Sequence, residues 1–246
     1  PDEGGWASIG PSTTPFGENW QTPKAMDRDD MDTVKAAFVS ATERSARLGF
    51  DFMELHGAHG YLMSSFLSPL ANDRNDEYGG SLENRMRFPL EVVAAVREVW
   101  PEDKPLCMRI SGTDWLDEGW TEEDSVAFAV AAKDLGLDIL HLSSGGNTMF
   151  RPPVGPGEPG YQLPAAEKVR REAGLPTMGV GYINEPQFAE DVIASGKCDM
   201  VAMARGMLYN PRFPAARSRG PGCRRYLRQP VRPRQTRDVA QRLRGA

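Results

Sequence analysis

The chain has 246 residues, of which 40% are hydrophobic and 26% are charged, proportions that are ordinary for a globular protein with a sizeable core. No stretch approaches 18 consecutive apolar residues, which excludes a membrane-spanning helix, and the polar N-terminus is unlike a signal peptide. Three scattered cysteines do not form a disulfide framework or a zinc cluster, so a reducing cytoplasm is the expected location.

The first 24 residues are polar, rich in glycine and proline, and carry no strand signal. There is no initiator methionine, and this start is typical of a piece of a longer chain. Beyond it, short apolar runs alternate with amphipathic stretches. The predicted elements are a helix over 31–48, a strand over 50–55, a long polar loop over 56–80, a helix over 81–100 capped by Ser81, a strand over 106–111, a helix over 121–135 capped by Thr121, a strand over 139–142, a helix over 163–173, a strand over 177–180, a helix over 185–195 and a strand over 200–204.

Five short, almost wholly apolar strands that alternate with helices indicate an α/β fold with a parallel sheet. Both a doubly wound sheet and a (β/α)8 TIM barrel fit this pattern. A doubly wound nucleotide binder should have a glycine-rich turn after its first strand, whereas this chain has the run HGAHGY over 56–61. Polar residues instead follow the strands at their carboxyl ends, which favours a partial TIM barrel over 1–214 with about strands 4 to 8 present.

The C-terminal residues differ in composition from the rest of the chain. From Arg212 to Ala246 there are eleven arginines, no lysine and one acidic residue, a net charge of +10, so the other residues carry −15 of the total of −5. Three interpretations of the atypical arginine-rich tail over 215–246 remain open: a shifted reading frame, a disordered tail, or a basic arm that binds polyanions.

The densest cluster of chemically active residues follows the first strand. His56 and His59 are three residues apart and can face one pocket, with Tyr61 close by. A metal pair would need further ligands, and no cysteine or carboxylate stands at a suitable spacing, so no metal site is predicted. Two readings stay open: purely structural histidines, or hydrogen-bond donation to a substrate oxygen with Tyr61 as proton donor.

Two arginines point to an anion. Arg109 lies inside an apolar strand, where its charge requires either an internal acid or a bound anion. Gly179 and Gly181 follow the fourth strand and Arg205 follows the fifth. The loops after the last two strands of a barrel commonly bind phosphate, and an arginine beside backbone N–H groups suits that role.

Several motifs, in order along the chain, resemble the old yellow enzyme family of FMN-dependent NAD(P)H:flavin oxidoreductases. The resemblance spans roughly residues 5–214 and looks closest to the bacterial ene-reductase subgroup. It implies that the chain is a fragment without the family's first three strands, which supply much of the cofactor site. The motifs are HGAHGYLMSSFLSPLANDRNDEYGGSLENRMRF (56–88), LCMRISGTDW (106–115), HLSSGGN (141–147), PGYQLPAAEKVR (159–170), GVGYI (179–183) and MVAMARGMLYNP (200–211).

This resemblance implies FMN as cofactor, with NADPH or NADH as reductant. His56 and His59 would hold the carbonyl or nitro oxygen of an activated alkene, which then accepts hydride from reduced FMN and a proton from Tyr61. Arg109 would lie at the N1/O2 edge of the flavin. Two pairs of consecutive residues would contact the FMN phosphate, namely Val180–Gly181 and Ala204–Arg205.

The predicted activity is therefore the NAD(P)H-dependent reduction of enones and nitroalkenes. A related enzyme acting on nitro compounds is an alternative within the same class, and a catalytically inactive fragment or polyanion-binding module is an alternative outside it. The expected partner is a small-molecule substrate, without a membrane or nucleic acid, and the full-length protein is a candidate homo-oligomer. The loop over 62–88, with Asp73, Arg74, Asp76 and Arg85, is expected to pack as a structural lid rather than to do chemistry.

Overall fold

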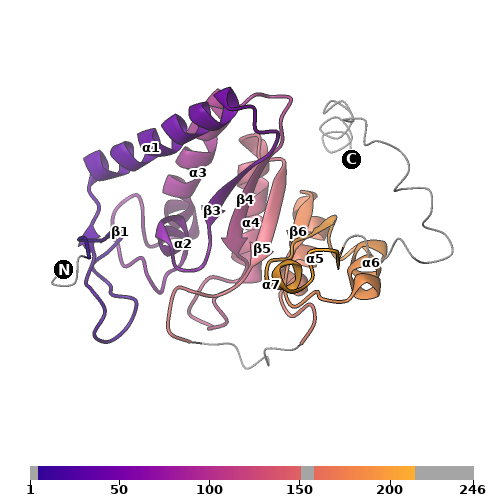
Figure 1. The fold of residues 1–246 in the computed structure, drawn as a ribbon. Coiled ribbons are helices and arrows are strands. Elements are labelled where there is room, and N and C mark those ends of the chain that lie inside the picture. Colours follow the sequence, from indigo (N-terminus) through magenta and orange to yellow (C-terminus); the bar gives the residue numbers. More distant parts are fainter. Residues whose placement is uncertain (1–4, 151–157, 214–246) are drawn as a thin grey trace.

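The computed structural model describes residues 5–150 and 158–213. Its central sheet has five parallel strands, each beside the one that precedes it in the chain (Figure 1). This order has no reversal, as in a TIM barrel and unlike a doubly wound sheet, so the predicted partial barrel is confirmed. The strands are β3 (Met53–Gly57), β4 (Leu106–Ser111), β5 (Ile139–Ser143), β6 (Thr177–Gly179) and β7 (Met200–Val201).

Five helices of nine or more residues connect or precede these strands: α1 (Arg28–Arg47), α3 (Leu82–Val99), α4 (Glu122–Asp134), α5 (Leu163–Ala173) and α6 (Pro186–Ala194). Their apolar residues form one core with the outward-facing strand residues. In that core Leu106, Met108 and Leu140 are fully buried, as are Val92 of α3 and Phe128 of α4. Burial on this side explains why the strands are so apolar.

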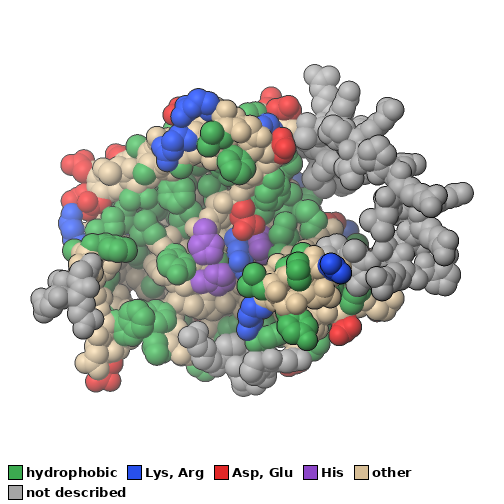
Figure 2. Space-filling model, in the orientation of Figure 1, with side chains coloured by type: hydrophobic (Ala, Val, Ile, Leu, Met, Phe, Trp, Pro, Cys, Tyr) green, Lys and Arg blue, Asp and Glu red, His purple; other side chains and the backbone are tan. Residues whose placement is uncertain are grey.

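The opposite side of the sheet, the inner face of the partial barrel, is polar. In register across β3, β4 and β5 lie His56, Arg109 and His141. Glu54 and Ser143 belong to the same alternating set. Figure 2 shows histidine, basic and acidic side chains gathered in a hollow of this face, with hydrophobic side chains around them.

The predicted helix caps at Ser81 and Thr121 are confirmed. Ser81 accepts a hydrogen bond from the backbone of Asn84, and Thr121 forms a capping box with Asp124. The N-terminus of α1 is three residues earlier than predicted, because Asp27 and Asp30 form another capping box.

Three local predictions are wrong. The first strand lies at Met53–Gly57 rather than 50–55, because the apolar residues Phe50 and Phe52 are exposed and the ladder begins later. The loop over 56–80 contains the short helix α2 (Leu62–Leu67). Within the supposedly strandless N-terminal 24 residues, Ile9–Gly10 (β1) pairs with Lys24–Ala25 (β2), a contact too short to leave a periodic signal.

The arginine-rich tail over 215–246 lies outside the described residues, and so does Cys223. Cys107 and Cys198 are free and buried. Within 5–150 and 158–213, no helix has the length and apolar character needed to cross a membrane. The cytoplasmic location stays a prediction.

Candidate functional site

The two histidines and the tyrosine do come together at the carboxyl end of β3. The ring centroids of His56 and His59 are 5.3 Å apart, and those of His56 and Tyr61 are 5.5 Å apart. His56 belongs to the strand itself, His59 to the turn after it, and Tyr61 is the N-cap residue of α2. Tyr61 is 64% exposed, so its side chain is accessible from solution.

The turn that carries His59 is held against the end of β5. The backbone N–H of His59 donates to Ser111 Oγ (3.0 Å), and Ser111 Oγ in turn donates to the carbonyl of Gly145 (2.7 Å). Gly60 has φ +77°, and a β-carbon there would overlap the carbonyl oxygen of Gly146. Only glycine allows this close approach of two loops.

Both histidines are neutral near pH 7. Burial, followed by the charge of Arg109, lowers the pKa of His59 to about 4. The same two causes lower the pKa of His56. A neutral imidazole can donate one N–H to a ligand without bringing a charge into the site.

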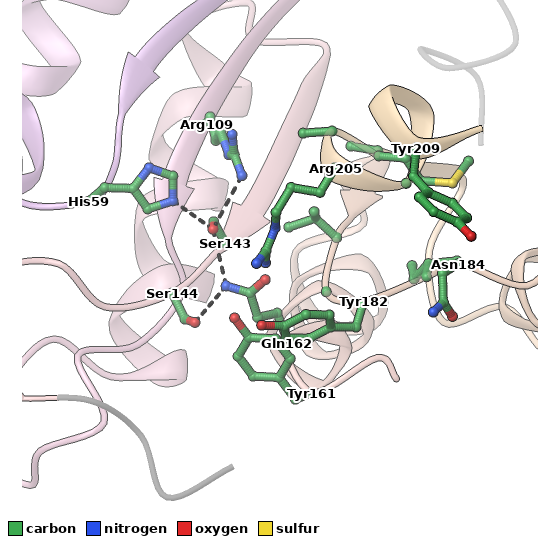
Figure 3. A pocket seen from close by; sticks show the side chains of 17 residues that line it. His59, Arg109, Ser143, Ser144, Tyr161, Gln162, Tyr182, Asn184, Arg205 and Tyr209 are labelled. Atoms are coloured by element: carbon green, nitrogen blue, oxygen red, sulfur yellow. Dashed lines mark hydrogen bonds between the residues drawn. The ribbon is translucent and has the colours of Figure 1, made fainter. Parts of the chain in front are cut away.

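Ser143, at the end of β5, connects the histidine turn to Arg109. Its Oγ lies 2.7 Å from His59 Nε2, 3.3 Å from Arg109 Nη2 and 3.1 Å from Gln162 Nε2 (Figure 3). The arginine and the amide can only donate, so they occupy both acceptor sites of the hydroxyl, and its proton is directed at His59. His59 therefore carries its own proton on Nδ1, which is free to donate elsewhere.

Arg109 has no carboxylate partner within ion-pair distance among the described residues, and its buried Nε atom makes no hydrogen bond there. Burial lowers its pKa, although Glu54 and Cys107 act in the opposite direction. Glu54 itself accepts a hydrogen bond from His141 Nδ1 (2.7 Å). Between the two readings of Arg109, these contacts favour the bound anion over the internal ion pair.

A cavity of about 540 Å³ opens beside Arg109, at the carboxyl ends of β4 to β7. Six of the eight predicted site residues line it: His59, Arg109, Val180, Gly181, Ala204 and Arg205. Tyr61 borders a different cavity of about 890 Å³, which is also lined by Trp6, Phe16 and Trp20. The ring of His56 connects the two cavities, because it contacts His59 at the first cavity and Tyr61 at the second.

Arg205, the first residue of α7 (Arg205–Tyr209), approaches the cavity from β7. Its guanidinium carbon lies 4.8 Å from the ring centroid of Tyr182, which directly follows Gly181 (Figure 3). Gly181 has φ +126°, a conformation reserved for glycine, and its carbonyl accepts from Gly160 N–H (2.7 Å). The loop after β6 thus presents backbone to the cavity.

The segment over 62–88, which contains α2 and the first turns of α3, packs against its surroundings as predicted for a structural lid. Arg74 donates to the backbone carbonyls of Pro11 and Met26 (both 2.8 Å) and pairs with Asp76. Arg85 donates to the carbonyl of Leu67 (2.9 Å). The side chains of Arg74 and Arg85 therefore hold this segment against the rest of the fold.

Several site residues were not predicted from the sequence. The cavity is also lined by Ser143 at the end of β5, by Tyr161 and Gln162 before α5, and by Tyr182 after β6, and nothing local distinguishes these residues. His141 could have been found, because it alternates with Ser143 on an inward-facing strand. In the part of the chain that the structure describes, no group of three or more potential ligands could hold a metal ion.

Comparisons with known proteins identify the family of the chain. The model of the NADH:flavin oxidoreductase / NADH oxidase family matches residues 7–220. The NADPH dehydrogenases of Geobacillus sp. (strain WCH70) and Clostridium acetobutylicum are 47% and 42% identical over 208 and 210 residues, 85% and 83% of this chain. Both matches cover 60% of those proteins, so the chain spans about three fifths of their length.

Solved structures show the same relationship. Morphinone reductase is 27% identical, with a TM-score of 0.70 over 86% of this chain and 59% of its own. A 2-naphthoyl-CoA reductase is 26% identical, with a TM-score of 0.79 over 85% of this chain and 32% of its own. Together with the family match over most of the chain, these likenesses show that the chain belongs to the NADH:flavin oxidoreductase / NADH oxidase family, the old yellow enzyme family, whose cofactor is FMN and whose reductant is NAD(P)H.

Proposed function

We propose that this chain carries the substrate-binding half, and part of the FMN site, of an oxidoreductase that uses NAD(P)H to reduce activated C=C bonds in enones and nitroalkenes. One observation carries the proposal. His56, His59 and Tyr61 meet at the end of β3, and His59 shares a hydroxyl partner with Arg109, which lines the adjacent cavity. Neutral hydrogen-bond donors, a phenol and unpaired arginines suit a neutral, polarisable substrate beside an anionic cofactor.

The residues of the cavity fit FMN. Its volume of about 540 Å³ lies within the usual range of about 300–1,000 Å³ for small-molecule and cofactor sites. The unpartnered Nε of Arg109 is a donor for an electron-rich ring edge. The backbone at Val180–Gly181 and Ala204, with the side chain of Arg205, would hold the phosphate. When bound, reduced FMN supplies the hydride.

The histidine pair would bind the substrate oxygen. His59 has its proton on Nδ1, since Nε2 accepts from Ser143, so Nδ1–H is available to a carbonyl or nitro oxygen. His56 is also neutral, because burial and Arg109 lower its pKa. Two neutral donors withdraw electron density from the conjugated double bond and so make its β-carbon electrophilic.

Tyr61 would deliver the proton to the α-carbon. Its ring lies 5.5 Å from that of His56, so a substrate held by the histidines is within reach of the phenol. Reduction of the double bond adds one hydride at the β-carbon and one proton at the α-carbon. The proton is then replaced from solvent, because Tyr61 is exposed.

The Tyr61→Phe variant of the flavin-loaded protein tests this assignment. We expect the reduction of the flavin by NAD(P)H to keep its rate within about twofold, and the reoxidation of the flavin by an enone to slow by about 100-fold or more, the range of a lost general acid. Stopped-flow absorbance separates the two half-reactions. Equal losses in both would contradict the role of Tyr61 as proton donor.

The alternative acceptor class, nitro compounds, uses the same histidine pair and is distinguished by substrate profiling. The alternative of a polyanion-binding module depends on the tail over 215–246, which lies outside the described residues, and no contact of the described residues favours it. Binding to nucleic acid that falls steeply with salt would support that alternative.

A further inference from the structure

We infer that Tyr182 is a positioning residue that holds Arg205 over the cavity and thereby determines its preference for FMN over riboflavin. This inference rests on the proposed function, because it assigns Arg205 to the phosphate. It goes beyond that function because it assigns a role to Tyr182, which acts through Arg205 and does not need to contact the phosphate itself.

The first observation is the contact itself. The guanidinium carbon of Arg205 lies 4.8 Å from the centroid of the Tyr182 ring, within the range of a cation–π interaction. Arg205 is exposed, and no salt bridge joins it to a carboxylate anywhere in 5–150 or 158–213. In that part of the chain the aromatic face is the contact that orients this charge.

The second observation is that Tyr182 is itself held in place. It has φ +47°, an uncommon conformation for a residue with a side chain, and it directly follows Gly181 at the cavity wall. Its ring lies 5.8 Å from that of Tyr161, which stacks on Trp115 at 6.3 Å with an interplanar angle of 22°. Three rings from three separate loops thus form a row that ends at Arg205, and Figure 3 shows its last two members, Tyr161 and Tyr182.

A fixed guanidinium changes the energetics of binding. An exposed arginine has many rotamers, and ordering it when a ligand binds costs affinity. The Tyr182 ring restricts Arg205 before binding, so less of this cost falls on the binding step. FMN and riboflavin differ only in the phosphate, and the benefit should therefore appear in the affinity for FMN and not in that for riboflavin.

The first test compares the dissociation constants of FMN and riboflavin by fluorescence titration. For Tyr182→Leu we expect the FMN affinity to fall about three- to tenfold, the range of an exposed to partly desolvated cation–π contact, and the riboflavin affinity to change less than twofold. Tyr182→Phe keeps the ring and should restore the preference. Tyr161→Leu removes the ring that packs on Tyr182 but does not contact Arg205 directly, so it should lower the FMN affinity by less than Tyr182→Leu does.

A double-mutant cycle distinguishes the loss of the Tyr182–Arg205 contact from a general disruption of the cavity. In an Arg205→Ala background, Tyr182→Leu should cause no further loss of FMN affinity, because the two residues act through one contact. If the losses multiply, or if Tyr182→Leu weakens FMN and riboflavin equally, the inference is overturned. A wild-type chain that binds both flavins with equal affinity would overturn the phosphate site in the proposed function as well.

The second test needs no flavin. An Nε–H above an aromatic ring gives an NMR signal shifted upfield by the ring current, and the signal of Arg205 is identified by its loss in Arg205→Lys. We expect this upfield shift in the wild-type chain and in Tyr182→Phe, and its disappearance in Tyr182→Leu. An unshifted signal in the wild-type chain would show that Tyr182 does not hold Arg205.

Discussion

His59 Nε2 lies 2.7 Å from Ser143 Oγ, and this contact connects the turn after β3 to the carboxyl end of β5. The same hydroxyl accepts from Arg109 and from Gln162. A proposed substrate-binding residue and a proposed cofactor-binding residue therefore share one hydrogen-bond partner, and this partner determines which nitrogen of His59 carries the proton.

Ser143→Ala should destabilise the chain and change the tautomer of His59. Ser143 is buried, and its loss leaves the donors of Arg109 and Gln162 without this acceptor, at a cost of about 2–3 kcal/mol. Urea unfolding measures the loss, and 15N NMR shifts of the imidazole should show a protonated Nδ1 only while Ser143 is present. Ser144→Ala is the control, because the Ser144 hydroxyl accepts only from Gln162 among these groups and should change the tautomer little.

The stability of the chain should fall as the pH falls from about 6.5 to about 4. Burial and Arg109 lower the pKa of His59 to about 4, so the unfolded chain binds a proton in this window that the folded chain does not bind. The stabilising preference for neutral His59 is fully present above pH 6.5 and is lost progressively below it.

His59→Gln removes the contribution of His59 titration to the stability. The difference in unfolding free energy between the variant and the wild-type chain should therefore vary between about pH 6.5 and about pH 4 and be constant above pH 6.5. Urea midpoints between pH 7.5 and pH 4.5 measure the difference. A difference that does not change with pH would contradict the neutral, buried state of His59. Titrating carboxylates act in both chains and cancel in the comparison.

Gly60→Ala should be more destabilising than an ordinary substitution of a left-handed glycine. At Gly80, where φ is +79° and no atom lies near the new β-carbon, alanine should cost about 1–2 kcal/mol. At Gly60, with φ +77°, the β-carbon would also overlap the backbone of Gly146. We expect an additional loss of about 1 kcal/mol or more. Equal losses at the two glycines would show that the loops after β3 and β5 do not approach so closely.

The fold was predictable because its signals are local and repeated. The apolar strands, the caps at Ser81 and Thr121, and the glycines that end helices each follow from a few neighbouring residues. The errors at β1, β2 and α2 concern elements of two to six residues, which are too short for periodicity to register.

The site was predictable only in part, for a related reason. Arg109 is conspicuous because it is a charge inside an apolar strand, and the histidines are conspicuous because they are rare in this chain. Ser143 at the end of β5 and Tyr182 in the loop after β6 are common residue types at such positions. Their importance arises from contacts with residues far away along the chain. His59 and Ser143 are 84 positions apart, and Tyr182 and Arg205 are 23 positions apart. Such contacts become visible only in the folded structure.

The most direct measurement of the central claim is an FMN titration of the 1–246 chain, followed by flavin absorbance and fluorescence. The account predicts saturable binding that weakens about 10- to 100-fold in Arg109→Ala and in Arg205→Ala, the effect of losing one charged hydrogen bond in each case. Circular dichroism of each variant establishes that it is folded. A folded wild-type chain that binds no FMN, or binds it equally well without either arginine, would contradict the assignment of this cavity to the cofactor.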